Sequence, residues 1–330
     1  MYALRKAALS ILFVVVLFAV AVIAKAQQSK KFFHIGLLSS GSASSANRNT
    51  EVLRQRLREL GYVEGKNIAF EYRSAEGKFD RLPDLAAELV RLKVDVIVTV
   101  STPPTVAAKN ATATIPIVMA GGTDPVEMGL VASLARPGGN LTGIIIMNAE
   151  TASKRLQLLK EITPKVSRVA VLWNSTNSGT ALNFKQIQAA AQKLSLQLQS
   201  LDVHSVSDLE SSFKSATRSG AHALVVLQSA PMATHLREVA DFAVRNRLPS
   251  IHDRSEFVEA GGLMSYGANI PDTSRRAAVY IDKILKGTKP ADLPVEQPMK
   301  FDLVINLKTA KQIGLTIPQS VLYRADKVIK

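Results

Sequence analysis

Ser101 and Thr102 are the residues whose position first suggests chemistry. The segment VDVIVTVSTPPTVAAKNAT, residues 94–112, is apolar up to Val100 and turns polar at this hydroxyl pair, and a helical pattern follows two prolines. Backbone N–H groups in the first turn of a helix lack partners and attract anions. The pair therefore either caps the helix, with Pro103 in its first turn, or holds the negative group of a ligand.

Small polar residues and glycines follow the other predicted strands in the same way. In open parallel sheets, ligands bind outside the carboxyl ends of the strands, so these residues line one crevice if the two halves of the chain face each other. Because such residues end strands in both halves, ligand binding by Ser101 and Thr102 is favoured slightly over a plain helix cap. The candidate ligand-binding residues at the strand ends are Ser40, Gly41, Ser101, Thr102, Gly121, Gly122, Thr123, Asp124, Asn174, Ser175, Gln228, Ser229 and Asp253.

The run Gly121-Gly122-Thr123-Asp124 precedes a segment, residues 126–134, whose pattern predicts a helix. Two glycines let the backbone approach a ligand closely, which a helix cap does not require. Asp124 could hold a cationic ammonium group, although capping of the predicted helix is the favoured role for its carboxylate.

Two aromatic residues end predicted strands. Trp173, the single tryptophan, is expected to fill the core, which leaves Asn174 and Ser175 behind it as the better pocket candidates. Tyr266 ends an apolar run just before a predicted helix, where a strand leaving one lobe could deliver a helix to the other. Its ring would then lie beside the crevice, available for stacking, and it completes the set of candidate ligand-binding residues.

The segment HDRSEFVE concentrates titratable groups at His252, Asp253, Arg254 and Glu256. A hydrolase would need an acid–base pair of this kind. The nucleophile motif G-x-S-x-G is missing, and the other histidines show no metal-ligand spacing. A recognition or surface role is therefore favoured over catalysis, and neither a metal nor an organic cofactor is expected.

Strands and helices alternate throughout residues 32–270, and each predicted strand is almost continuously apolar. This pattern is typical of parallel sheets covered by helices on both faces. The order of elements repeats once. The fold class is therefore predicted as α/β, with two Rossmann-like, doubly wound lobes.

The first 26 residues read as a targeting segment. Arg5 and Lys6 precede an apolar run, and Ala24-Lys25-Ala26 provides an A-x-A cleavage signal. We expect cleavage after Ala26 and export; the alternative is an uncleaved transmembrane anchor. With no cysteine available for disulfides or an N-terminal lipid, the periplasm is the most economical location.

The formal net charge is +14, and +11 once Arg5, Lys6 and Lys25 are removed with the targeting segment. The basic residues are spread along the chain, without an aromatic-rich basic cluster. A solvated basic surface is therefore favoured, and no nucleic-acid partner is expected.

Several long segments together resemble a known family: RELGYVEGKNIAFEYRSAEGKFDRLPDLAAELVRLKVDVIV, GLVASLARPGGNLTGI, residues 254–267, and KPADLPVEQPMKFDLVINLKTAKQIGLTIP. They are similar to the substrate-binding proteins of ABC importers described as tryptophan/tyrosine transport systems, from about Phe32 to the C-terminus. The resemblance implies the type I periplasmic-binding-protein fold, with hinge crossings near residues 142–148, 265–272 and 300–305. The implied N-lobe is 32–146 with 272–300, and the C-lobe is 147–271 with 301–330.

By analogy of position, the wider fold supports Ser101, Thr102 and Thr123 as contacts of an amino acid. The chain departs from the family at Ser74, where a tryptophan is frequent, and at residues 252–253, which are often Tyr-Gly. An aromatic wall is thereby removed and a charge added. The resemblance therefore does not fix whether the solute is aromatic.

The leading hypothesis is a periplasmic solute receptor that binds an amino acid or related carboxylate between closing lobes and delivers it to an ABC permease in the inner membrane, as a monomer. The alternative is a sensory receptor of the same fold that feeds a membrane kinase or chemoreceptor. A third hypothesis is an enzyme with His252 and Asp253 as acid and base. Its missing nucleophile, metal cluster and nucleotide fingerprint speak against it.

Overall fold

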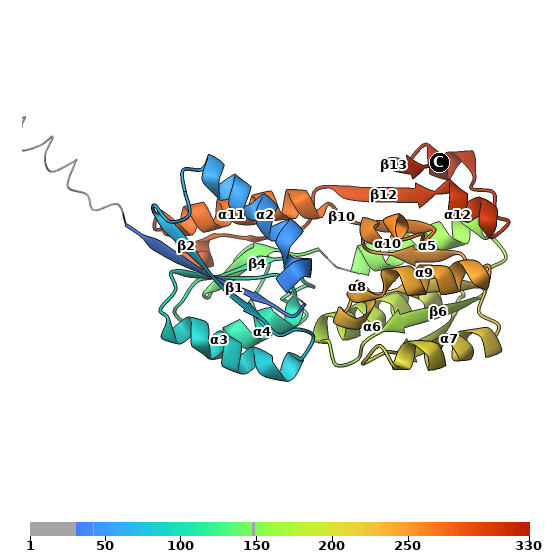
Figure 1. The fold of residues 1–330 in the computed structure, drawn as a ribbon, viewed down its shortest axis with the longest axis horizontal. Coiled ribbons are helices and arrows are strands. Elements are labelled where there is room, and N and C mark those ends of the chain that lie inside the picture. Colours follow the sequence, from blue (N-terminus) through green and yellow to red (C-terminus); the bar gives the residue numbers. More distant parts are fainter. Residues whose placement is uncertain (1–30, 42, 147–148) are drawn as a thin grey trace, which may run out of the picture.

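The chain forms two α/β lobes lying side by side (Figure 1). The computed structural model describes residues 31–41, 43–146 and 149–330, so the predicted targeting segment, residues 1–26, lies outside the described residues. None of the helices in these described ranges is both long and apolar enough to cross a membrane.

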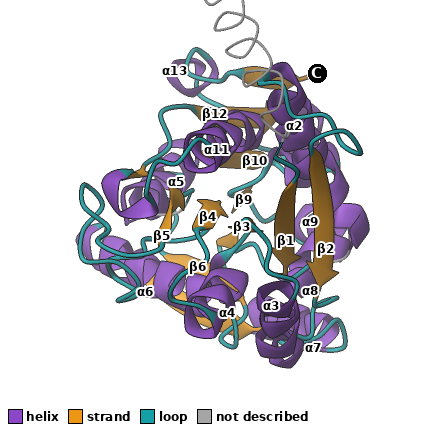
Figure 2. Cartoon of the chain, turned by 90° about the vertical axis from the view of Figure 1, so that its left-hand side faces the viewer, coloured by secondary structure: helices purple, strands orange, loops and turns teal. Residues whose placement is uncertain are grey.

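The first lobe contains a sheet of six parallel strands in the order β11-β5-β4-β3-β1-β2. The strands are β1 (Phe33–Ser39), β2 (Ile68–Ser74), β3 (Val96–Thr99), β4 (Ile117–Ala120), β5 (Leu141–Ile144) and β11 (Val295–Glu296). Helices cover both faces of this sheet (Figure 2). They are α2 (Ala43–Glu59) and α11 (Ile270–Leu285) on one face, and α3 (Leu82–Arg91) and α4 (Thr102–Ala111) on the other, with short 3-10 turns at Phe79–Arg81 and Pro290–Asp292.

The second lobe contains seven strands in the order β13-β12-β10-β9-β8-β6-β7, parallel except where β12 runs antiparallel to β10. The strands are β6 (Arg168–Trp173), β7 (Gln197–Asp202), β8 (Ala223–Val226), β9 (Ser250–His252), β10 (Met264–Ala268), β12 (Phe301–Asn306) and β13 (Lys327–Ile329). One face is covered by α5 (Ala149–Ile162), α6 (Ser178–Lys193), α12 (Leu307–Gln312) and α13 (Gln319–Leu322). The other carries α7 (Asp208–Arg218), α8 (Ala230–Thr234), α9 (Leu236–Arg245) and α10 (Ser255–Glu259).

The apolar strands have two buried faces, as their composition predicts. In β3, Val96 and Val98 pack with residues of α2 and α11, whereas Ile97 between them packs with residues of α3 and α4. A strand covered on both sides has no position for an exposed side chain, so its sequence does not alternate between apolar and polar residues. The predicted fold class, α/β with two lobes built on parallel sheets, is confirmed.

Three passages of the chain connect the lobes. The first follows β5 and leads to α5, the second leads from β10 to α11, and the third leads from β11 to β12, which extends between the lobes along one edge (Figure 1). Helix α11 begins at Ile270 and packs on the sheet of the first lobe. The lobe boundaries stated above stay a prediction.

The helix predicted over residues 126–134 is wrong, because this segment forms turns. The carbonyl of Pro125 accepts the N–H groups of Leu130 and Val131, and Gly129 has a φ of +68°, outside the helical region. The apolar spacing of this segment arises from packing of Leu130, Val131 and Leu134 against the cluster beneath α3 and α4.

Candidate functional site

The strand ends of both lobes meet at the junction between them (Figure 1). A Cβ atom added to Gly179, at the start of α6, would lie 2.5 Å from Oγ1 of Thr102, at the start of α4 in the other lobe. Glu127 of the first lobe accepts a hydrogen bond from Gln186 of the second at 3.0 Å. The two lobes are therefore in direct contact, and groups at the strand ends between them are shielded from water.

Ser101 occupies the N-cap position of α4, but its side chain makes no capping hydrogen bond. Its Oγ lies 2.9 Å from Oγ of Ser40 at the end of β1. Prolines at 103 and 104 have no N–H, so the first turn of α4 offers little backbone for an anion. Any anion at the start of α4 would therefore be bound mainly by side-chain hydroxyls and not by backbone N–H groups.

Thr102 and Thr123 join the ends of β3 and β4. Oγ1 of Thr102 accepts the backbone N–H of Thr123 at 3.0 Å, and the positive φ of Gly121 and Gly122, +132° and +129°, allows this close approach. The side chain of Thr123 is only 2% exposed, and its Oγ1 has no hydrogen-bond partner. Thr102 thus has a structural role, whereas the hydroxyl of Thr123 is not used by the fold.

The second lobe repeats the arrangement at the end of β8. Ser229 is the N-cap residue of α8 with φ −147° and ψ 169°, close to the −156° and 174° of Ser101, and it too makes no capping bond. Ser229 is 3% exposed, and neither its Oγ nor the buried Oε1 of Gln228 has a partner. Buried polar atoms of native proteins normally have partners, so Gln228 and Ser229 remain candidates for contact with a bound molecule.

Asp253, after β9, contributes a carboxylate that is 6% exposed. Its Oδ1 lies 3.0 Å from Nδ1 of His252, but that nitrogen accepts the N–H of Arg254 at 2.8 Å, and Oδ1 has no hydrogen-bond donor. Burial would raise the pKa of Asp253, yet the neighbouring His252, Arg254 and Arg155 side chains hold this pKa below its ordinary value. Asp253 is therefore an ionised carboxylate whose Oδ1 has no hydrogen-bond donor.

The His252 ring is fully buried and lies against Phe257, with centroids 5.4 Å apart, and its Nε2 has no hydrogen-bond partner. Within residues 31–41, 43–146 and 149–330, no group of three or more histidine, aspartate or glutamate side chains is arranged to hold a metal ion.

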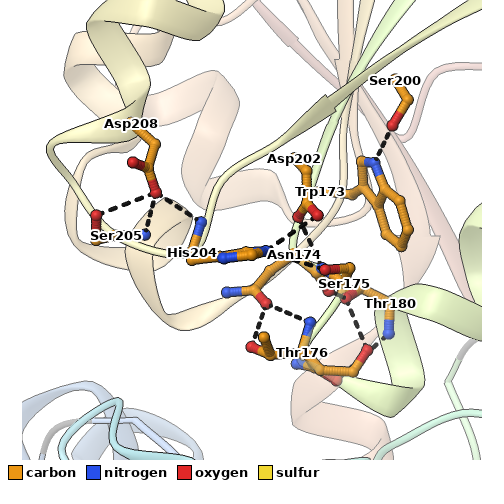
Figure 3. A network of polar contacts seen from close by, with 11 residues as sticks. Trp173, Asn174, Ser175, Thr176, Thr180, Ser200, Asp202, His204, Ser205 and Asp208 are labelled. Atoms are coloured by element: carbon orange, nitrogen blue, oxygen red, sulfur yellow. Dashed lines mark hydrogen bonds and ion pairs between the residues drawn. The ribbon is translucent and has the colours of Figure 1, made fainter.

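Asn174 and Ser175 belong to a polar network at the ends of β6 and β7 (Figure 3). Oδ1 of Asn174 accepts the backbone N–H and the hydroxyl of Thr176, at 2.9 and 2.5 Å. Ser175 donates its N–H to Asp202, and its Oγ lies 3.0 Å from Nε2 of His204. These polar groups already have protein partners, unlike the unpaired atoms of Thr123 and Ser229.

The remaining predicted residues have local roles. Oδ1 of Asp124 accepts the N–H of Val126 at 2.8 Å and stabilises a turn, not a helix. The carbonyl of Gly41 accepts the hydroxyl of Ser74. Tyr266 stacks on Phe301 where β10 and β12 pair, 5.7 Å between ring centroids, and burial together with Glu150 raises its pKa.

Trp173, expected to fill the core, packs against its edge. It is partly buried and stacks on Phe184 of α6 with ring centroids 4.2 Å apart. Its Nε1 donates to the hydroxyl of Ser200, which positions the ring at the end of β6 (Figure 3).

Arg155 is a residue that the sequence reasoning missed. It lies on α5 and is fully buried beside the C-lobe end of the site. The available signal was its spacing, because Ala152, Arg155, Leu159 and Ile162 form the apolar stripe of this helix. A charge within such a stripe needs a buried counterpart.

A small cavity of about 110 Å³ lies on the hinge side of Asp253. Its wall combines residues of the second lobe with the start of α11, and its acidic members are Asp253, Glu256 and Asp302. Burial raises the pKa of Asp302, which accepts a hydrogen bond from Asn269 at 2.8 Å. This cavity therefore extends the polar region between the lobes up to the crossing strands.

Comparison with known proteins is consistent with this geometry. The model of the ABC transporter substrate binding protein family matches residues 37–329. A tyrosine-binding protein of Clostridioides difficile is 28% identical over 291 residues, covering 88% of this chain and 84% of that protein.

Two solved structures of similar proteins differ in their ligand state: one is a complex with L-Trp and the other is ligand-free. The ABC domain from Streptococcus pneumonia in complex with L-Trp is 30% identical, covers 91% of this chain and 100% of its own, and has a TM-score of 0.84. The ligand-free, open structure of a substrate binding protein with adhesive properties from Clostridium difficile is 25% identical, covers 90% and 99%, and has a TM-score of 0.67. The TM-score is therefore higher for the tryptophan complex than for the ligand-free, open structure.

The contrast between Thr102 and Ser229 is testable without a solute. Thr102→Val removes the acceptor of a buried N–H and should lower the free energy of unfolding by about 1–3 kcal/mol. Ser229→Ala removes a buried hydroxyl without a partner and should change it by less than about 0.5 kcal/mol, or increase it. Urea denaturation of both variants measures the difference. A loss at Ser229 as large as that at Thr102 would mean that the fold uses the Ser229 hydroxyl.

Proposed function

Because the chain belongs to the ABC transporter substrate binding protein family, we propose that it is the solute-binding component of an ABC importer, closing its two lobes on a small solute. One observation carries this proposal. Buried polar atoms without partners come from strand ends of both lobes, at Thr123, Gln228, Ser229 and Asp253, close to the lobe contact.

The solute class follows from the chemistry of these groups. The hydroxyls of Thr123 and Ser229 can donate to a carboxylate, as can those of the Ser40–Ser101 pair. The ionised Asp253 and the carbonyl oxygen of Gln228 need donors, which a protonated amine supplies. An amino acid or closely related carboxylate fits both demands, and the names of the tyrosine- and tryptophan-binding relatives make those two amino acids the first candidates.

Closure of the lobes is the proposed mechanism. Each unpaired buried group costs about 1–3 kcal/mol, so the closed form without solute is disfavoured. A solute that pairs groups of both lobes at once binds the closed form more tightly and shifts the population towards it. No bond is made or broken, and no cofactor takes part.

The cellular setting completes the proposal. Residues 1–26 act as a signal peptide, the mature chain begins at Gln27 in the periplasm, and the closed form is recognised as a monomer by a permease in the inner membrane. The scattered basic residues form a solvated surface and do not bind nucleic acid.

A thermal-shift screen of residues 27–330 against amino acids, short peptides and small carboxylates tests the solute class. A solute that binds only the folded form stabilises it by RT ln(1 + [L]/Kd), so a micromolar ligand at millimolar concentration raises the melting temperature by several degrees. We expect the largest shifts from amino acids, with L-tyrosine and L-tryptophan among them. The deaminated and decarboxylated analogues should give smaller shifts. If an analogue without the amine stabilises as strongly as its parent, the assigned role of Asp253 is contradicted.

Gly179 tests the closure mechanism. Its missing Cβ leaves room for Thr102 of the other lobe, and no intralobe atom is as close as 3.0 Å to that position. Gly179→Ala should therefore spare the stability of the free protein but oppose closure, weakening the affinity for the best solute of the screen about tenfold or more, by isothermal titration calorimetry. The control is Gly139→Ala, where the added methyl would meet only the flexible end of Lys109. Equal affinities of the two variants would contradict closure through this contact.

A further inference from the structure

A hydrogen bond between Glu127 and Gln186 joins the two lobes. Glu127 lies in the turns that follow β4 of the first lobe, and Gln186 lies on α6 of the second. Nε2 of Gln186 donates to Oε2 of Glu127 at 3.0 Å, across 59 positions of sequence. Because its partners belong to different lobes, this hydrogen bond forms only when the lobes are in contact.

Gln186 lies on the side of α6 that faces the first lobe. Gly179, whose added Cβ would meet Thr102 of the first lobe, precedes it by seven residues, which is about two helical turns. The two residues therefore share one side of the helix. Gln186 is 7% exposed and Gly179 is buried, so this side of α6 is shielded from water at both of these contacts with the first lobe.

Neither side chain of this pair is engaged by its own lobe. The carbonyl oxygen Oε1 of Gln186 is buried without a hydrogen-bond partner, and its amide nitrogen donates to Glu127. Within the described residues, no lysine, arginine or histidine nitrogen lies within 4.0 Å of the Glu127 carboxylate. The hydrogen bond therefore contributes to the contact between the lobes and not to the fold of either lobe.

The turn that carries Glu127 is fixed by Asp124 of the same lobe. Oδ1 of Asp124 accepts the N–H groups of Val126 and Glu127, at 2.8 and 3.4 Å. The Glu127 carboxylate is therefore presented to α6 by an ordered turn, although the residue itself is exposed.

We propose that the Glu127–Gln186 hydrogen bond is a latch of the closed form, and that its two residues set the affinity for every solute without selecting between solutes. The apparent dissociation constant is that of the closed form divided by the fraction of molecules that are closed without solute. Loss of the latch lowers this fraction and weakens every solute by the same factor. The effect on affinity rests on the proposed function, whereas the effect on the closed fraction is a property of the solute-free protein.

The size of the effect follows from the chemistry of the pair. A hydrogen bond to an ionised carboxylate is stronger than one between neutral groups. Glu127 is exposed, so water solvates its carboxylate in the open form and offsets part of this stabilisation. Loss of the latch should therefore lower the closed fraction about three- to tenfold.

The experiment exchanges the partners of the latch. Gln186→Glu places two carboxylates opposite each other and should lower the closed fraction about threefold or more, because the donor is lost and like charges repel. Adding Glu127→Gln restores an amide–carboxylate pair with its partners reversed and should recover most of the closed fraction. Single-molecule energy transfer between one fluorescent label on each lobe measures this fraction without solute, at about pH 8, where exposed carboxylates are ionised.

The matched control is Gln188→Glu, which adds the same charge at an exposed position of α6 and should leave the closed fraction unchanged. Glu127→Ala covers the case in which Gln186→Glu does not fold. It removes the acceptor from an exposed turn and should lower the closed fraction without lowering the melting temperature of the solute-free protein. An unchanged closed fraction in the single variants, or no recovery in the double variant, overturns the proposal.

Titration calorimetry with the two best solutes of the screen separates a latch from a solute contact. Glu127→Ala should weaken both solutes by the same factor, equal to the loss of closed fraction. Unequal factors would mean that the pair contacts the solute, and the assignment as a latch fails. The closed fraction is measured without solute, so failure of the solute screen and failure of this inference are distinguished.

Discussion

The parallel direction of the strands in both lobes is the constraint on which the rest of the structure depends. Parallel strands end at one edge of a sheet, and the two sheets turn these edges towards each other. Several residues that end strands next to the lobe junction, among them Thr123 and Ser229, are buried where the lobes meet. Buried polar groups need partners, so the junction is stable only when its polar atoms are paired.

The two lobes share the same arrangement of a serine between a strand and a helix. Ser101 and Ser229 each follow a buried strand and precede a helix with extended backbone angles. Neither side chain makes a capping hydrogen bond to that helix. Thr102 shows the alternative, since its hydroxyl accepts a backbone N–H and is part of the fold. In the proposed site, the hydroxyls of Thr123 and Ser229 are the ones that no group of the protein pairs.

The sequence was sufficient to predict the fold class for two reasons. Strands buried on both faces, such as β3, are continuously apolar, and strand segments alternate with helix segments along the chain. The candidate site was predicted less evenly. The rule of the strand end selected Thr123, Ser229 and Asp253, which carry unpaired buried atoms, but also Asn174 and Ser175. Asn174 is paired with Thr176, and Ser175 is paired with Asp202 and His204. Whether a loop hydroxyl finds a partner depends on packing of segments distant in sequence, which a local pattern does not contain.

Arg155 was missed for the same physical reason. Its burial follows from the packing of α5 on β10 and α6, where its guanidinium donates to Tyr266 and Asn183. A charge in an apolar helical stripe is the only trace of this arrangement in the sequence. The turn that replaces the predicted helix after Asp124 is a further case, because long-range packing, not helical periodicity, placed its apolar residues.

The most direct test of the account is the distance between the lobes in solution. The chain has no cysteine, so Asp84→Cys on α3 and Ser211→Cys on α7, both exposed, provide a unique pair of sites for fluorescent labels. Single-molecule energy transfer between them, without and with a saturating amount of the best solute from the screen, measures closure. The account predicts an open population without solute and a single high-transfer population with it. The same transfer distribution in both conditions would contradict closure on the solute as the basis of function.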